Sequence, residues 1–102
     1  MIAMKKIKKY VSMIKDEIES AECYAEKYIE AKAIGETANA EKYKLFAQQE
    51  IDHGMFIHQI ASDFIAKVQK VVTPPADMME KWNEAHIECI EKVDMIKNML
   101  AK

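Results

Sequence analysis

Two glutamates and a histidine carry the most distinctive chemistry in this chain of 102 residues. Glu50 and His53 lie three positions apart, and Glu17 lies upstream of both. Residues three apart share one face of a helix, so Glu50 and His53 can reach the same ion. Carboxylate and imidazole ligands together suit iron, manganese or zinc. We therefore interpret Glu17, Glu50 and His53 as candidate metal ligands.

These residues must be positioned by helices. The spacing of apolar residues predicts an all-α chain, with helices over about residues 3–33, 38–71 and 76–100. Gly35 and the pair Pro74-Pro75 mark the two breaks, and Thr37 is the expected N-cap of the second helix. The two long helices should form an antiparallel hairpin, to which a shorter third helix is added. We expect all 102 residues to form one domain, because a chain of this length buries a single core.

The candidate ligands fall on the predicted inner faces of the first two helices. Around Glu50 and His53, the apolar stripe of the second helix contains Tyr43, Phe46, Ala47, Ile57, Ile60 and Phe64. Measured from Gly35, Glu17 and His53 are each 18 residues away, which is about 27 Å at the helical rise. We therefore expect the three residues to meet at one height inside the bundle. A buried carboxylate there would need a cationic partner.

Other interpretations compete at the same positions. Glu22 and His86 are second-rank ligand candidates, and a core or interface position is the simpler interpretation of His86. Glu50 and His53 could form a hydrogen-bonded pair without metal. Glu17 could be a solvated residue at the edge of the stripe. The eight methionines are scattered, so we interpret them as core filler rather than as copper ligands.

The same residues resemble the ferritin-like di-iron superfamily. In its first helical hairpin, a Glu, six intervening residues and a Tyr precede an E-x-x-H segment, as do Glu17, Tyr24 and Glu50 to His53. Rubrerythrins carry similar runs, and the resemblance covers about residues 10–65. It implies a di-iron site in a four-helix bundle, with Fe(II) oxidation by oxygen or peroxide. Tyr24 would then support the site by hydrogen-bonding a ligand or by supplying an electron.

Departures from the superfamily pattern predict an assembly. The chain has no fourth helix and no second E-x-x-H segment, so it offers half of a set of four carboxylates and two histidines. Two chains about a two-fold axis would supply the whole set. Encapsulated ferritins, a short-chain branch of the superfamily, look like that arrangement. We expect a homodimer or a ring of dimers, while residues 96–102 show no peptide that would address the chain to a protein shell.

Composition argues against several classes of protein. A net charge of −2 gives no reason to expect nucleic acid, and no apolar run approaches the roughly 20 residues that span a bilayer. The first residues lack the apolar core of a signal peptide, and Cys23 and Cys89 form no close-spaced pair, so we expect a cytoplasmic location.

Three functions fit these observations. The first is a metal-binding protein with ferroxidase activity at a di-iron site shared by two chains. The second is a non-enzymatic assembly module that uses the same hairpin. The third is a structural zinc or manganese site without turnover. The sequence leaves open whether the protein is an enzyme.

Overall fold

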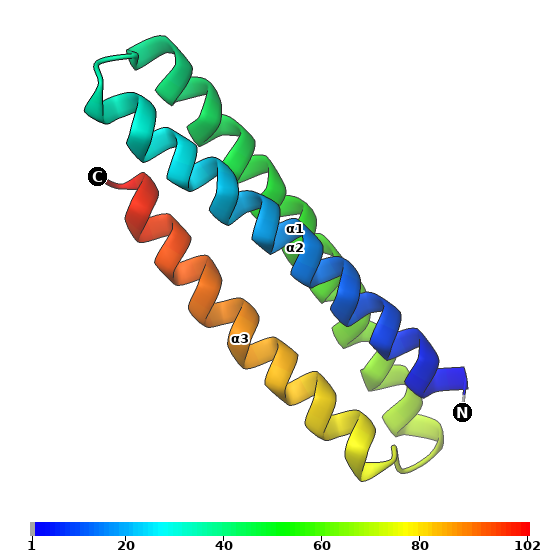
Figure 1. The fold of residues 1–102 in the computed structure, drawn as a ribbon. Helices are drawn as coiled ribbons and strands as arrows, with labels where there is room; N and C mark the ends of the chain where they lie inside the picture. The colour runs from blue at the N-terminus through cyan, green and yellow to red at the C-terminus, as the bar shows by residue number, and fades with distance from the viewer. Residues whose placement is uncertain (1) are drawn as a thin grey trace.

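Three helices build an elongated bundle in the computed structural model, which describes residues 2–102. They span Ile2–Ala33 (α1), Thr37–Val71 (α2) and Ala76–Leu100 (α3). α1 and α2 lie antiparallel along their length and form a hairpin, while α3 returns parallel to α1 and packs mainly against it (Figure 1). The molecule measures 55 × 17 × 16 Å. The prediction of an all-α fold is confirmed, and the helix bounds agree with the expected ones to within one residue.

Gly35 ends α1 by adopting a left-handed conformation, with φ of 78°. The Glu36 N–H donates to Ala31 O at 2.9 Å, and the Gly35 N–H donates to Lys32 O at 3.2 Å. This pair of bonds is the Schellman motif, which satisfies carbonyls at a helix C-terminus. A residue without a Cβ adopts the required φ at no steric cost. The predicted role of Gly35 is confirmed.

The start of α2 differs from the prediction. Thr37 is not the N-cap but the first helical residue, and Glu36 holds the capping position without a side-chain capping bond. The reason is that Glu36 O already accepts the Ala40 N–H at 2.9 Å, so helical bonding begins one residue earlier. At the second break, α3 begins directly after Pro75, whose φ of −57° suits the residue before a helix.

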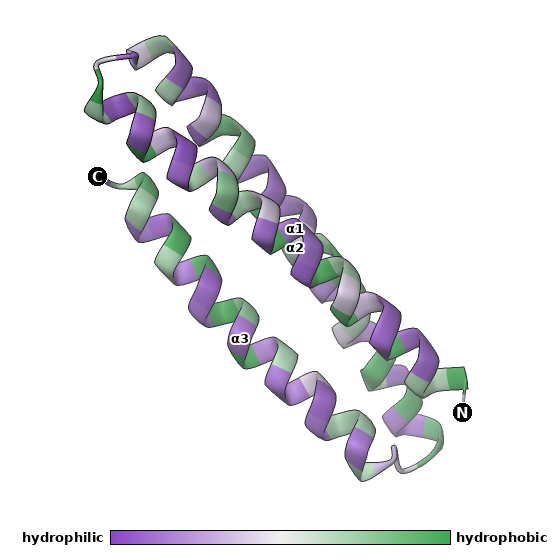
Figure 2. Ribbon diagram, in the orientation of Figure 1, coloured by the Kyte–Doolittle hydropathy of each residue, from purple (hydrophilic) through white to green (hydrophobic). Residues whose placement is uncertain are grey.

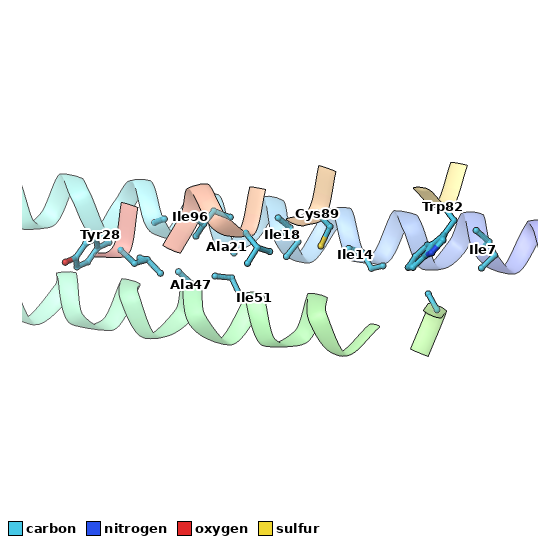
Figure 3. Packing of buried hydrophobic residues seen from close by; sticks show 14 of the residues in the cluster. Ile7, Ile14, Ile18, Ala21, Tyr28, Ala47, Ile51, Trp82, Cys89 and Ile96 are labelled. Atoms are coloured by element: carbon cyan, nitrogen blue, oxygen red, sulfur yellow. The ribbon is translucent and has the colours of Figure 1, made fainter. Parts of the chain in front are cut away.

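The core lies between the hairpin and α3. Ile14, Ile18 and Ala21 of α1 meet Ala47 and Ile51 of α2 in one continuous layer (Figure 3). α3 covers this layer with Met78, Trp82, Cys89, Val93, Ile96 and Leu100, all buried. Hydrophilic and hydrophobic residues alternate along each helix, as expected when a helix buries only one stripe (Figure 2). Within residues 2–102, no polar or charged side chain is buried.

Over residues 2–102, no helix is both long enough and apolar enough to cross a bilayer.

Candidate metal centre

Glu17 of α1 and Glu50 and His53 of α2 come together near the middle of the hairpin. Each offers one ligand atom, and these atoms lie within 4.8 Å of one another. His53 Nδ1 is 3.6 Å from Glu17 Oε2 and 3.4 Å from Glu50 Oε1. We call these three residues the Glu–His centre. The structure therefore brings together the residues that equal spacing from Gly35 places at one height.

The Glu–His centre lies at the surface of the chain. The side chains of Glu17, Glu50 and His53 are 31%, 23% and 60% exposed. The expectation of an interior position is thus wrong for a single chain. The reason is that α3 covers another side of the hairpin, where Glu22 contacts Lys92 and His58 contacts His86.

The spacing along the helices explains this separation. Glu22 is five positions from Glu17, and His58 is five positions from His53. Five positions correspond to a rotation of about 140° around a helix. The hairpin therefore has one side covered by α3 and another side that carries the Glu–His centre.

An apolar surface surrounds the Glu–His centre on the uncovered side of the hairpin. Ring pairs bridge α1 and α2 beyond each end of the centre, with Tyr24 and Phe46 5.4 Å apart and Tyr10 and Phe64 6.2 Å apart between centroids. Phe46 and Ile60 are each 37% exposed. We call this surface the open face, and its residues are Tyr10, Met13, Glu17, Tyr24, Tyr43, Phe46, Glu50, His53, Ile57, Ile60 and Phe64.

Proximity of two carboxyl groups controls the charge of the centre. The pKa of Glu50 is raised, chiefly because a hydrogen bond with the Glu17 carboxyl stabilises its protonated form. Burial and repulsion from Glu17 act in the same direction, while His53 opposes them. A divalent cation would relieve this repulsion, since it favours both ionised carboxylates. The electrostatics of the site are therefore compatible with a bound divalent cation.

The raised pKa of Glu50 predicts a stability effect in metal-free protein. Because the folded state binds the proton more readily than the unfolded state, ionisation of Glu50 costs stability as the pH rises above its ordinary value of 4.5. Glu50→Gln removes that cost. We expect Glu50→Gln to have a higher Tm than wild type at pH 7 in chelator, with the gain vanishing below about pH 4. Thermal unfolding followed by circular dichroism at both pH values measures this.

Glu41→Gln is the matched control, because Glu41 is an exposed glutamate elsewhere on α2. A Glu50→Gln variant less stable than wild type at pH 7 would contradict the expected repulsion. It would indicate instead that the contact of Glu50 with His53 stabilises the metal-free chain.

The remaining predicted site residues lie elsewhere. Tyr24 is partly buried and packs on Tyr43 and Phe46, with ring centroids 6.4 and 5.4 Å away. The Glu22 carboxylate accepts a hydrogen bond from Lys92 Nζ at 2.9 Å, an ion pair that raises the pKa of Lys92. His86 is exposed and contacts His58. The structure thus places Glu22 and His86 outside the Glu–His centre, and the supporting role of Tyr24 stays a prediction.

Gly54 is a positioning residue that the sequence analysis did not single out. A Cβ at Gly54 would lie 2.7 Å from Ile18 Cδ1 and 3.5 Å from Glu17 Cβ. The missing side chain therefore lets α2 approach α1 directly beside the Glu–His centre. The signal was present in the sequence, because a glycine inside a helix costs about 1 kcal/mol and usually has a packing reason.

Comparisons with known proteins found no relative of this chain. No family model, curated protein or solved structure matches the chain. The resemblance to the ferritin-like superfamily consequently rests on Glu17, Tyr24, Glu50 and His53 alone.

Proposed function

We propose that two copies of this chain pack through their open faces into a ferritin-like four-helix bundle, which binds two metal ions and oxidises Fe(II). The observation that carries the proposal is the position of the Glu–His centre within an apolar helical seam.

The seam on α2 has the spacing of a helix–helix interface. Its open-face residues are separated by three and four positions in strict alternation, at Tyr43, Phe46, Glu50, His53, Ile57, Ile60 and Phe64. Such a repeat is typical of a helix that packs lengthwise against another helix. α1 contacts one edge of this repeat, where Tyr24 packs on Tyr43 and Tyr10 packs on Phe64. α3 lies on a different side of the hairpin, so within residues 2–102 no further helix covers the exposed members Phe46, His53 and Ile60. A second copy offers a surface of the same length and pattern.

Ligand number supports the same assembly. One chain offers two carboxylates and one imidazole, and Glu17, Glu50 and His53 are partly open to solvent. Two chains offer four carboxylates and two imidazoles, which suit a pair of metal ions in a helical bundle. Four negative charges would also balance two divalent cations. The second copy would remove the ions from water and strengthen these interactions.

Fe(II) is the substrate that this ligand set supports best. Two Fe(II) ions together lose the two electrons that reduce one molecule of hydrogen peroxide to two hydroxides. Oxygen could instead accept the two electrons together with two protons and be reduced to hydrogen peroxide. Carboxylates favour the more highly charged product ion, and His53 binds metal in its neutral form. Tyr24, on the same face, would orient a ligand or donate an electron.

Two rival functions predict different results. A structural zinc or manganese site would bind metal without consuming an oxidant. An assembly module would dimerise without metal, and a double change of Glu50 and His53 to Leu would leave the dimer intact or strengthen it, because apolar packing replaces a polar pair. In the proposed function, the same double change abolishes Fe(II) binding and weakens the dimer.

Oxidant consumption tests the proposed activity. Fe(II) is added to metal-free protein under air, and an oxygen electrode and the absorbance of Fe(III) are followed together. We expect oxidation faster than in buffer, and loss of that excess rate in Glu17→Ala. Glu19→Ala, which removes an exposed carboxylate two positions away, should retain it. A rate equal to that of buffer alone would contradict the ferroxidase proposal.

A further inference from the structure

A second cluster of metal-binding side chains lies where α2 faces α3. Met55 and His58 lie three residues apart on α2, and His86 and Cys89 lie three residues apart on α3. His58 Nε2 and His86 Nδ1 are 2.7 Å apart, and Cys89 Sγ lies 4.0 Å from Met55 Sδ. Each helix thus supplies one imidazole and one sulfur.

The two contacts follow a single antiparallel register. Moving three residues back along α2, from His58 to Met55, corresponds to moving three residues forward along α3, from His86 to Cys89. Side chains three apart on a helix are neighbours, with Cβ atoms about 5–6 Å apart. The nitrogen pair and the sulfur pair are therefore one helical turn apart on one interhelical surface.

We propose that Met55, His58, His86 and Cys89 form a binding site for Cu(I), independent of the Glu–His centre. Thiolate and thioether sulfur are soft ligands that select Cu(I), and imidazole also binds copper. The Glu–His centre has no sulfur ligand and suits iron, manganese or zinc instead. The two clusters would therefore discriminate between metals by ligand chemistry.

Within each pair, the observed distance is close to the one that a tetrahedral ion requires, and the imidazole pair must move toward the sulfur pair, one helical turn away, for all four side chains to share an ion. Two sulfur ligands at about 2.3 Å from an ion lie about 3.8 Å apart, near the 4.0 Å between Cys89 Sγ and Met55 Sδ. Two nitrogen ligands at about 2.0 Å lie about 3.3 Å apart, so His58 and His86 must separate by about 0.6 Å. His86 is exposed, so its ring can rotate toward the sulfur pair.

The surroundings of the cluster favour ligation over other roles. Burial and the neighbouring His86 lower the pKa of His58, which keeps this imidazole in the neutral form that binds metals. Cys89 is buried, so its sulfur is shielded from solution oxidants, while burial raises the pKa of the thiol and the ion must therefore displace its proton. Figure 3 shows Cys89 and Trp82 both reaching from α3 into the layer between the helices. On coordination, the thiol of Cys89 would release its proton to solvent.

Trp82 provides a local reporter for this site. It is the single tryptophan of the chain, and its ring centroid is 5.0 Å from that of His58 and 6.2 Å from that of His86. An ion held by these imidazoles would lie close enough to quench its fluorescence. Loading of the Glu–His centre on the other side of the hairpin should have a smaller effect.

The test is an anaerobic titration of metal-free protein with Cu(I) bound to the chromophoric chelator bicinchoninate. Competition with the chelator gives the affinity, and Trp82 emission shows where the ion binds. We expect one tightly bound Cu(I) per chain with quenching of Trp82. Met55→Leu, His86→Gln and Cys89→Ser should each weaken binding at least about tenfold. Met55→Leu keeps the side-chain volume and His86→Gln changes an exposed residue, so both should fold.

Two matched controls are available in the chain. Cys23→Ser removes the other thiol, which is exposed on α1, and His53→Gln removes a histidine of the Glu–His centre. Both variants should bind Cu(I) as wild type does. Binding that survives in Met55→Leu and His86→Gln, binding that is lost in Cys23→Ser, or no binding against the chelator would each overturn the proposal.

Discussion

Glu50→Ala and His53→Ala each reduce the affinity for Fe(II) by roughly 100-fold or more, while Asp52→Ala leaves it unchanged. Glu50 and His53 lie on the open face, within 4.8 Å of a ligand oxygen of Glu17. Asp52 lies between them in sequence but is exposed off the seam. Each of the three variants therefore removes one polar side chain from the same stretch of α2. Glu50→Ala and His53→Ala change the open face, whereas Asp52→Ala does not. Calorimetric titration with Fe(II) without oxygen gives the three affinities.

The same variants should separate binding from folding. None of these side chains is buried, so each variant should keep the helical content of wild type. Fe(II) affinities equal to that of wild type in all three variants would contradict the assignment of the Glu–His centre. Equal loss in all three would point to a general effect of negative charge on α2.

Ile96→Ala costs about 2–5 kcal/mol of unfolding free energy, whereas Ile90→Ala costs about 1 kcal/mol or less. Both residues are isoleucines of α3, but Ile96 is fully buried and Ile90 is 47% exposed. Truncation of Ile96 leaves a cavity between α3 and the hairpin that its neighbours fill only in part. Urea unfolding of both variants at one protein concentration measures the difference.

This comparison tests which side of α3 faces the hairpin. Losses of similar size in the two variants would mean that α3 does not pack as the structure has it. A larger loss in Ile90→Ala would mean that α3 is rotated about its axis. In either case, the side of the hairpin left open for a second copy would have to be reassigned.

Local rules predicted most of the fold. Gly35 and Pro74-Pro75 interrupt helical bonding for reasons that depend only on their own backbones, so both breaks were predicted correctly. The prediction of Thr37 as the N-cap was wrong. Glu36 takes the capping position because of backbone hydrogen bonds that form only once the whole turn is folded, so the residue type of Thr37 alone does not reveal them. The meeting of Glu17 with His53 followed from counting residues from the turn, since both helices rise at the same rate.

The side covered by α3 could not be predicted from the apolar pattern. α1 and α2 each carry two apolar stripes, one facing the core through Ile18 and Ile51 and one on the open face through Tyr24 and Phe46. The two stripes merge into one broad face when a helix is considered alone. Only the packing of α3 separates them, which is why the Glu–His centre was expected inside the chain and lies at its surface.

The sulfur and imidazole cluster could not be predicted from the sequence for a related reason. Met55, His58 and Cys89 give no signal as separate residues, and His86 was a candidate ligand only for the Glu–His centre. A periodicity argument treats Met55 and Cys89 as core. Their relation appears only when α2 and α3 are aligned as antiparallel helices about the turn at residues 72–75. Counting residues from that turn would not have found them, because His58 lies 13 residues before the end of α2 at Val71, whereas His86 lies 10 residues after the start of α3 at Ala76.

The central claim is that two chains share the metal ions. Native mass spectrometry of the protein, loaded with Fe(II) in the absence of oxygen, tests it most directly. We predict a species with the mass of two chains and two iron ions, or a whole multiple of it, that is absent in Glu50→Ala. A species with the mass of one chain that holds iron at the same loading, or a dimer without iron, would contradict the claim.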